Sequence, residues 1–518
     1  MKRIYSVILV ALLVTTVFVF TACRRDTATG RTRKDTLVFA LHAMPTNLDP
    51  AFGNDMPSIG VMLQMYDTLV TMDFDMNHAP GAAERWQFEN DAQGNPTRVR
   101  FFLKRGIKFH NGDDLTAHEV KFSLDRAVAS PITGFITGNI SGVEVINDYE
   151  LVVTTAFPFV PILNNLAHPL TSLVSSRAVR EAGHDLFGQS PVGSGPYRVT
   201  NIVAGDRIEL TRWEGYHGTP ARIENLVVRV MTDLATRQIE LETGGVDIIW
   251  NIPASDLARN MAHPDVQVMR GPNFQTDFIM MNTSRQPFND IRVRQAMNYA
   301  IDSEALVNSV WRGVGGVANG PLTSNVWASL AGTGALPPYT YNPARARELL
   351  AEAGYPNGFN TTIWLNEVSH RVDIAEITQN MLREVGVNVD ISIMEWGAVL
   401  ERTGRGEHDM MIVGWVTVTG DPDYGLHPTH HSVSYGAHGN RSFWSTPETD
   451  RLLDQGRAEP DPVRRAAIYD QVQRIAWENA PWIYVWSGES VNALRADVRG
   501  FRIHPSASHP LWTVYFED

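Results

Sequence analysis

The chain contains a single cysteine, Cys23, among its 518 residues. One thiol cannot form an intramolecular disulfide or supply the cysteine cluster of a structural metal site. Stability must therefore come from the burial of a hydrophobic core, and the chain is long enough for two or more domains. Its hydrophobic content, 43%, is ordinary for a globular protein. The sequence thus predicts a large folded body that has no covalent cross-link.

The N-terminus has the pattern of a secretory signal. A basic start precedes an apolar run over 4–20, which is followed by small residues and Cys23. Its end, Phe20-Thr21-Ala22-Cys23, resembles a bacterial lipobox, in which the cysteine is lipidated and becomes the new N-terminus. We expect a lipoprotein signal peptide over 1–22, a lipid on Cys23 and a flexible tether over 23–35. A transmembrane anchor is the alternative, because the apolar run is near the length that spans a bilayer.

Charge and motifs argue against two other classes of protein. The net charge of −13 argues against a protein that binds nucleic acid irrespective of sequence, because such a protein needs a basic surface. The sequence contains no Gly-x-Ser-x-Gly elbow, phosphate loop or zincin motif, so we expect no enzyme and no catalytic residue. A secreted hydrolase is kept as an alternative of a different class, since two carboxylates such as Asp421 and Asp423 suffice for glycoside hydrolysis.

Strand and helix patterns alternate along the chain. The run over 36–41 has the length and apolarity of a strand, and apolar residues alternate with polar ones over 387–393. Thr116 and Glu119 have the spacing of a capping box at the start of a helix. Asp290 can cap another helix. This mixture predicts an α/β protein.

Several separate stretches carry patterns that occur together in one protein family. Residues 101–123 are similar to the signature F-x-L-R-x-G-V-x-F-H-D-G-x-x-L-T-A-x-D-V-x-F-S, in which we expect His110 to be a turn residue rather than a catalytic base. Residues 191–197 are similar to P-V-G-T-G-P-Y, and residues 287–296 to P-F-D-D-x-R-V-R-Q-A. By these patterns, the chain is identified as a member of the extracytoplasmic solute-binding proteins of family 5, which serve importers of peptides, nickel and opines.

The resemblance implies a fold of two lobes joined by a hinge, a large three-segment variant of the type II periplasmic-binding-protein fold. The ligand cleft lies between the lobes, and ligand contacts on both lobes favour the closed state that the transporter recognises. We expect the following segments: 36–70, 191–278 and 485–518 as the core of lobe I, 71–190 as an accessory subdomain of lobe I, and 279–484 as lobe II.

The loop from Gly414 to Tyr424 follows an apolar strand pattern, and such a loop is a common place for binding groups. In dipeptide-binding relatives the matching stretch is G-W-x-x-D, and its Asp holds the ammonium of the peptide; Val418 stands at that position here. Asp421 or Asp423 can take that role, or both can shape a turn around Pro422. The stretch resembles the glutathione-binding branch of the family. Six of its residues are candidate ligand contacts: Gly414, Trp415, Thr417, Asp421, Asp423 and Tyr424.

Three further residues outside this loop are candidate ligand contacts. His370 and Arg371 precede a helical pattern where relatives often place an arginine that binds a carboxylate, and Arg can grip a carboxylate with two parallel hydrogen bonds. A solvated helix start is the alternative. Met44 follows the first strand and is expected to contribute backbone groups.

Four histidines between His427 and His438 raise the question of a metal, since clustered imidazoles bind transition metals. Their spacing fits no tight motif, and we expect neither a metal nor a cofactor.

The function that the resemblance implies is that of a lipoprotein subunit of an ATP-driven importer. We expect a monomer that captures a short peptide or glutathione-like solute and delivers it to the permease. It would do so in the periplasm or on the outer face of the cell membrane. The alternatives within the family are an oligosaccharide, an opine or a nickel or other metal chelate.

Overall fold

An eleven-stranded mixed sheet runs through the part of the chain that the computed structural model describes, residues 35–517. The expected signal peptide, Cys23 and nearly all of the tether lie outside the described residues. Ten strands follow one another across the sheet, and β13 (Gly316–Val317) pairs with β17 off this path. In sheet order they are β15 (Val387–Ile393), β14 (Phe359–Leu365), β16 (Met410–Val416), β12 (Val266–Met281), β17 (Trp482–Arg495), β11 (Ile248–Ile249), β1 (Thr36–Leu41), β10 (Asn225–Val230), β9 (Arg207–Arg212) and β8 (Tyr197–Val203).

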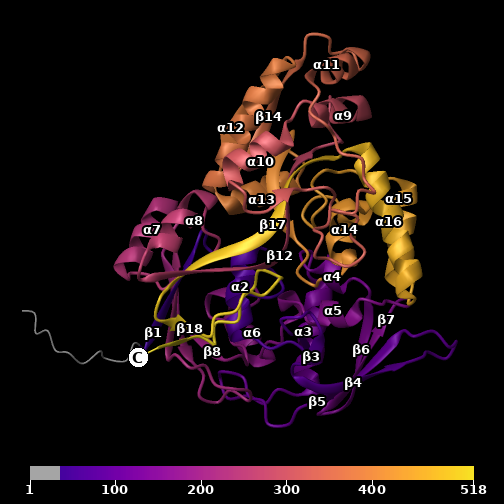
Figure 1. Ribbon diagram of the computed structural model, residues 1–518. Coiled ribbons are helices and arrows are strands. Elements are labelled where there is room, and N and C mark those ends of the chain that lie inside the picture. Colours follow the sequence, from indigo (N-terminus) through magenta and orange to yellow (C-terminus); the bar gives the residue numbers. More distant parts are fainter. Residues whose placement is uncertain (1–34, 518) are drawn as a thin grey trace, which may run out of the picture. The chain divides into compact units, whose positions relative to one another are not determined.

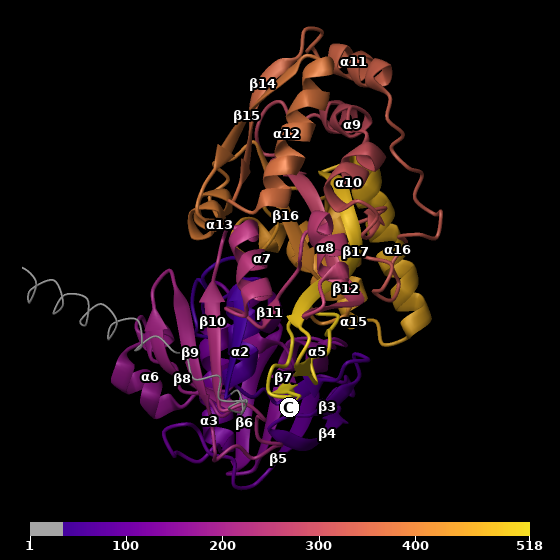
Figure 2. The ribbon, with the colours of Figure 1, turned by 60° about the vertical axis from the view of Figure 1, so that its left-hand side comes forward.

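Two long strands, β12 and β17, occupy the middle of this sheet. They pair antiparallel from Val266 opposite Arg495 to Met280 opposite Trp482, with irregularities between Pro272 and Thr276 and between Asp277 and Phe278. Strands β14 and β16 lie on one side of this pair, while β11 and β1 lie on the other. In Figures 1 and 2, β12 and β17 accordingly lie between two groups of elements at opposite ends of the described region.

Helices α9 (Ile291–Tyr299), α10 (Ser303–Trp311), α11 (Pro343–Glu352) and α12 (Ser369–Glu384) form the group at one end (top of Figure 1). They cover a core made with β14, β15 and one half of β12. A four-stranded antiparallel sheet lies at the other end, in the order β4 (Ala83–Glu89), β5 (Arg98–Leu103), β7 (Glu150–Thr155) and β6 (Ile140–Asn147). Two pairs of short strands complete the sheets: β2 (Val70–Met72) with β3 (His78–Pro80), and β18 (Val498–Arg499) with β19 (Tyr515–Phe516).

The helices come from all parts of the described chain. Within residues 35–517, none combines the length and the apolarity that spanning a bilayer requires. Their bounds are α2 (Met56–Met65), α3 (Ala117–Ala129), α4 (Gly134–Thr137), α5 (Ile162–Leu166), α6 (Ser176–Ala182), α7 (Leu234–Thr243), α8 (Ala254–Ala262), α9 (Ile291–Tyr299), α10 (Ser303–Trp311), α11 (Pro343–Glu352), α12 (Ser369–Glu384), α13 (Trp396–Gly404), α14 (Pro422–His430), α15 (Pro447–Ala458) and α16 (Pro462–Asn479).

Most local predictions from the sequence are confirmed. Strand β1 spans 36–41 and β15 spans 387–393, and Asp290 caps α9 by accepting a hydrogen bond from the Arg292 amide. The capping box is wrong. Thr116 does stand at the N-cap of α3, but its side chain makes no cap hydrogen bond. Glu119, the other half of the box, instead accepts hydrogen bonds from the Ser176 amide and hydroxyl at the start of α6. The segment boundaries expected at 70, 190, 278 and 484 stay a prediction.

His110 joins two of the recognised motifs. Its Nδ1 accepts the amide of Gly193 at 3.3 Å, and its Nε2 lies 3.0 Å from the carbonyl oxygen of Gly195. Burial lowers the pKa of His110 to about 4, so the ring is neutral at neutral pH. The histidine therefore serves the fold, as expected. The turn that it holds lies against the end of α2, where a Cβ on Gly193 would lie 2.0 Å from the carbonyl oxygen of Met65.

A pair of glycine substitutions tests this packing. We expect Gly193→Ala to lower the free energy of unfolding by about 1–3 kcal/mol, because the added methyl meets backbone that cannot move aside. The matched control is Gly60→Ala within α2, where a Cβ meets nothing within 4 Å. This control should raise stability by up to about 1 kcal/mol, since alanine favours helix. Urea unfolding of both variants measures the difference, and equal stabilities would contradict the packing argument.

Candidate ligand-binding site

A cavity of about 330 Å³ lies inside the described chain, bounded by residues from both sides of the β12–β17 pair. Its walls come from the start of α2, from α7, β12 and β16, from the start of α12 and from the loop that contains Gly439 and Arg441. The volume is near the lower limit for small-molecule sites, about 300–1,000 Å³. Five tryptophans line the cavity: Trp250, Trp311, Trp396, Trp415 and Trp486.

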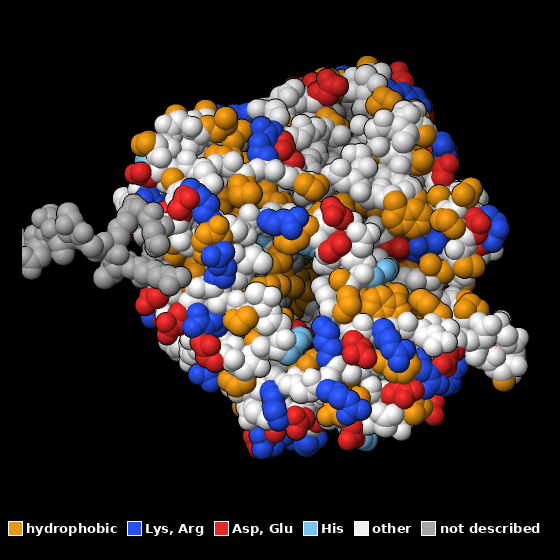
Figure 3. Space-filling view, turned by 60° about the horizontal axis from the view of Figure 1, so that its bottom comes forward, with side chains coloured by type: hydrophobic (Ala, Val, Ile, Leu, Met, Phe, Trp, Pro, Cys, Tyr) orange, Lys and Arg blue, Asp and Glu red, His pale blue; other side chains and the backbone are white. Residues whose placement is uncertain are grey.

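The molecular face in Figure 3 is hollowed, and apolar side chains gather around the hollow. Lys and Arg side chains are interspersed with Asp and Glu over the rest of this face. This face therefore offers no continuous basic track for a polyanion.

Asp277 and Arg371 bring opposite charges into the cavity. Asp277 is 3% exposed on β12, and its Oδ1 accepts a hydrogen bond of 2.7 Å from Nε2 of Gln275. Burial raises the pKa of Asp277 to about 6, while the charge of Arg371 acts in the opposite direction. Arg371 lies in the first turn of α12 and donates from Nη1 to Oδ1 of Asn366 at 2.8 Å. Its Nε is buried and has no hydrogen-bond partner among the described residues.

Gly414 keeps the space beside the Asp277 carboxylate open. The two residues face each other across the β12–β16 ladder. A Cβ at position 414 would lie 2.1 Å from Oδ1 of Asp277 and 2.8 Å from Nε2 of Gln275. A larger residue here would push both polar side chains aside, so glycine preserves a carboxylate that a ligand can reach.

Trp415 and Tyr424 offer the cavity apolar surfaces, because their polar atoms are already bonded. Nε1 of Trp415 donates to the carbonyl oxygen of Tyr424 at 3.1 Å. The Tyr424 hydroxyl lies 3.1 Å from Nε2 of His168, and these two rings stack. Val418 also lines the cavity, at the position where the dipeptide-binding pattern has an acid.

Asp421 and Asp423 form internal ion pairs. Asp421 caps α14 and accepts two hydrogen bonds, of 2.7 and 2.8 Å, from the buried guanidinium of Arg465. One oxygen of Asp423 lies 3.1 Å from Nε of Arg457. Neither acid belongs to the lining of the cavity formed by the described residues. Their pairing agrees with the alternative that these acids shape the turn around Pro422.

The expected ligand contacts thus fall into two groups. The cavity lining includes His370, Arg371, Gly414, Trp415 and Tyr424. The lining within residues 35–517 does not include Met44, which packs against a hydrophobic core, or Thr417, whose amide donates to the carbonyl oxygen of Phe274. Ligand contacts by Met44 and Thr417 stay a prediction, as do contacts by Asp421 and Asp423. For the two acids, the ion pairs are a physical argument against such contacts.

Asp277 is not among the ligand contacts expected from the sequence, although the residues that follow it carry a signal. Asp277 precedes the run Phe278-Ile279-Met280-Met281 in a buried strand, and an acid among such residues requires a partner or a function. Arg237 and Arg441, which also line the cavity, gave no comparable signal because surface helices and loops commonly contain arginine.

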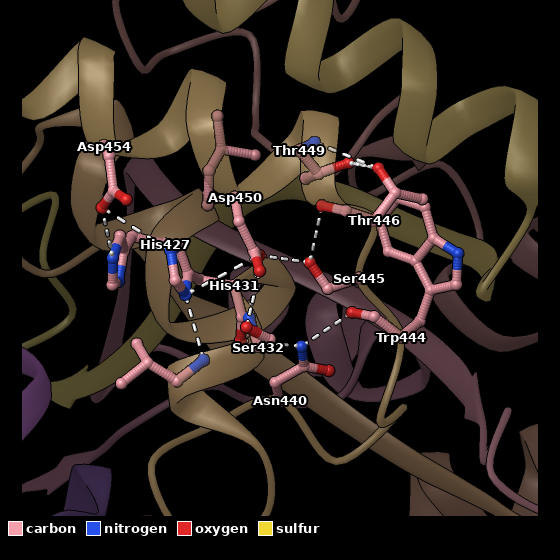
Figure 4. Close-up of polar contacts among 12 residues, drawn as sticks. His427, His431, Ser432, Asn440, Trp444, Ser445, Thr446, Thr449, Asp450 and Asp454 are labelled. Atoms are coloured by element: carbon pink, nitrogen blue, oxygen red, sulfur yellow. Dashed lines mark hydrogen bonds and ion pairs between the residues drawn. The ribbon is translucent and has the colours of Figure 1, made fainter.

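A histidine cluster lies between α14 and α15 (Figure 4). The rings of His427 and His431 stack with centroids 4.4 Å apart, and an oxygen of Asp454 lies 3.6 Å from Nε2 of His431. Nη1 of Arg457 lies 2.8 Å from Nε2 of His427, and Nδ1 of His431 accepts the amide of Val433. The guanidinium thus occupies the Nε2 side of His427, where a metal bound to that nitrogen would lie. The arrangement favours a hydrogen-bonded packing cluster over a metal centre.

A variant pair tests the structural role of Asp421. We expect Asp421→Ala to lower the free energy of unfolding by about 3–5 kcal/mol, because Arg465 would remain as an unpaired buried charge. The double variant Asp421→Ala/Arg465→Met should recover part of that loss. Asp454→Ala, which removes a side chain 62% exposed, is the control and should cost less than about 1 kcal/mol. A stable Asp421→Ala protein with weakened ligand binding would instead support a ligand contact.

Comparisons with known proteins agree with the family resemblance of the sequence patterns. Residues 77–437 match the family model described as "Bacterial extracellular solute-binding proteins, family 5 Middle". The chain is 32% identical over 482 residues to the glutathione-binding protein of Salmonella typhimurium, which covers 90% of this chain and 92% of that protein.

Two solved structures have a similar fold. A periplasmic binding protein from Helicobacter pylori in complex with the peptide STSA has a TM-score of 0.88 and 27% identity, covering 94% of this chain and 99% of its own. A dipeptide-binding protein from Pseudoalteromonas in complex with Met-Leu has a TM-score of 0.86 and 26% identity, covering 93% of this chain and 100% of its own.

Proposed function

The chain belongs to the bacterial extracellular solute-binding proteins of family 5, and we propose that it captures a short peptide or glutathione-like solute in this cavity and delivers it to the permease of an ATP-driven importer. Membership of this family makes it a two-lobed solute-binding transport protein rather than an enzyme.

The pair of opposite charges in the cavity carries the proposal. Asp277 can bind an ammonium group, and Arg371 can bind a carboxylate with parallel hydrogen bonds. Asp277 is buried and Arg371 is half-buried, and each makes only one side-chain hydrogen bond, so a neutral solute would leave both charges without a counterion. A peptide supplies one group of each kind. The tryptophan walls, with Trp415 and Tyr424 among the aromatic lining, then pack against the apolar parts of the solute.

An oligosaccharide is the alternative that the tryptophans alone would favour. Sugars stack on aromatic rings, but an uncharged sugar pairs with neither Asp277 nor Arg371. The proposed contacts are therefore those of a peptide: Asp277 for the ammonium, Arg371 and His370 around the carboxylate, and Gly414, Trp415 and Tyr424 along the wall.

A thermal-shift screen of the purified protein tests this function. We expect glutathione or di- to tetrapeptides to stabilise the fold by about 2.7 kcal/mol when present at 100 times their dissociation constant. The variant Arg371→Gln should lose most of this stabilisation, because it cannot pair with a carboxylate. A response to oligosaccharides or nickel chelates, with none to peptides or glutathione, would contradict the proposed ligand. It would leave the assignment to the family unchanged.

We also propose that Cys23 carries the lipid that holds the protein at the outer face of a membrane. The lipobox-like pattern before Cys23 supports this, and the long tether would let the folded part reach the permease. We expect Cys23→Ala to release the protein from the membrane fraction without changing solute affinity, because the cavity lies in residues 42–491. Cell fractionation with a binding assay measures both. A variant retained in the membrane would indicate an uncleaved anchor instead.

A further inference from the structure

Three arginines with unpartnered nitrogens line the cavity. They are Arg237 of α7, Arg371 of α12 and Arg441 of the loop before α15. In each, Nε is buried and has no hydrogen-bond partner among the described residues. Arg237 is only 3% exposed. For Arg237 and Arg441, the described chain supplies no side-chain hydrogen bond or ion pair to the guanidinium at all.

The carboxylates around the cavity do not balance these charges. Asp55 caps α2 and accepts hydrogen bonds from Ser58 and Thr46, and Glu489 pairs with Arg270. Asp373 is exposed. Asp277 is thus the one lining carboxylate within residues 35–517 that is buried and not engaged by a helix cap or an arginine hydrogen bond.

Other buried arginines of the described chain have partners. Arg126 grips Asp49 with two hydrogen bonds, and Arg465 grips Asp421 in the same way. Arg294 donates to the carbonyl oxygens of Phe288 and Asn479. An arginine that serves the fold is therefore paired in this protein, whereas Arg237 and Arg441 are not.

The three guanidiniums occupy two places along the cavity. The charges of Arg237 and Arg371 both lower the pKa values of His42 and His370. For His42, burial is the largest cause and these two charges come next, and together they lower its pKa to about 3. The same two charges help to lower the pKa of His370 to about 3. Both histidines are therefore neutral and add no positive charge at neutral pH. The charge of Arg441 instead lowers the pKa of His408, after burial as the largest cause. Arg441 lies in the loop that brings Gly439 against the Trp415 ring.

Burial of these unpaired charges has an energetic consequence. It lowers the pKa of Arg237 to about 10 and that of Arg441 to about 10, so both stay charged at neutral pH. The charge of Asp233 opposes this shift for Arg237, but no carboxylate of the described chain forms an ion pair with either guanidinium. A cation removed from water without such a pair destabilises the ligand-free protein. An anionic group of the ligand placed against each guanidinium would remove this penalty. The protein would then bind acidic solutes more tightly than neutral solutes of the same size.

We propose that the cavity selects short peptides or amino-acid conjugates with a net negative charge, which carry one ammonium group and at least two carboxylates. Asp277 holds the ammonium and Arg371 one carboxylate, while Arg237 and Arg441 bind the further acidic groups. The inference rests on the proposed function, since it assigns the charge of the solute in the same site. It adds two specificity-determining residues and excludes neutral dipeptides as preferred ligands.

Matched probes test the selectivity. Isothermal titration compares Ala-Glu with Ala-Gln, which differ by one carboxylate, and glutathione with its monoethyl ester. We expect wild type to prefer the acidic member of at least one pair tenfold or more, equal to about 1.4 kcal/mol. The double variant Arg237→Gln/Arg441→Gln should lose this preference. Arg451→Gln, at an exposed arginine of α15, is the control and should keep it.

The outcomes separate the two proposals. Equal affinity of the wild type for both members of each pair would overturn the charge selectivity and leave the peptide-binding function standing. Binding of none of the peptides or conjugates would overturn the proposed function and the selectivity with it. Loss of the preference in Arg451→Gln as well would show that the effect does not come from the cavity.

A second measurement distinguishes a binding role from a structural one. Arg237→Met keeps the apolar stem and removes the unpaired charge, so the ligand-free melting temperature should stay equal or rise. Arg126→Met, at a paired arginine, should lower it because Asp49 loses its partner. A drop for Arg237→Met as large as for Arg126→Met would mean that Arg237 serves the fold, and would overturn its assignment as a ligand contact.

Discussion

The antiparallel pairing of β12 with β17 is the interaction on which the rest of the structure depends. Each strand contributes residues to more than one hydrophobic core, so the ladder joins the two ends of the described chain. It also positions the cavity, because Asp277 lies on β12 and Trp486 lies opposite it on β17. One irregularity, between Pro272 and Thr276, falls just before Asp277, and a second lies between Asp277 and Phe278. The cavity therefore lies where the shared strands change register, and any relative movement of the two ends would alter its shape directly.

Much of the fold could be predicted because its determinants are local or belong to a long pattern. The apolar run at 36–41 and the alternation at 387–393 each place one strand correctly, and the motifs over 101–123 and 191–197 indicate the family. The structure shows why the two motifs occur together: His110 of the first motif forms hydrogen bonds with Gly193 and Gly195 of the second. The spacing of Thr116 and Glu119 could not show whether a capping box forms, because the hydrogen-bond donor to Glu119 is Ser176, which lies 57 residues away.

The site was harder to predict than the fold, since it depends on which partner a charge finds. Asp421 and Asp423 stand in the right loop, but Arg465 and Arg457 reach them from helices later in the chain. Asp277 and Arg237 lie in stretches that no loop pattern marks, and the tertiary structure leaves them facing the cavity. The number of charged residues can be counted in the sequence. Which of them can still bind a ligand depends on the ion pairs that the folded chain forms. Here the availability of guanidinium groups, rather than their number, is what distinguishes the cavity from the surrounding protein.

The position of β17 has a consequence for how the chain folds. This central strand spans Trp482–Arg495, yet its neighbours β11 and β12 precede it by more than 200 residues. The large sheet cannot close until almost the whole polypeptide is available, and pairings over such distances form slowly. A nascent chain therefore lacks its central strand while it is being synthesised. The topology of the sheet therefore delays the completion of folding until synthesis of the chain is almost finished, whatever folds earlier at either end.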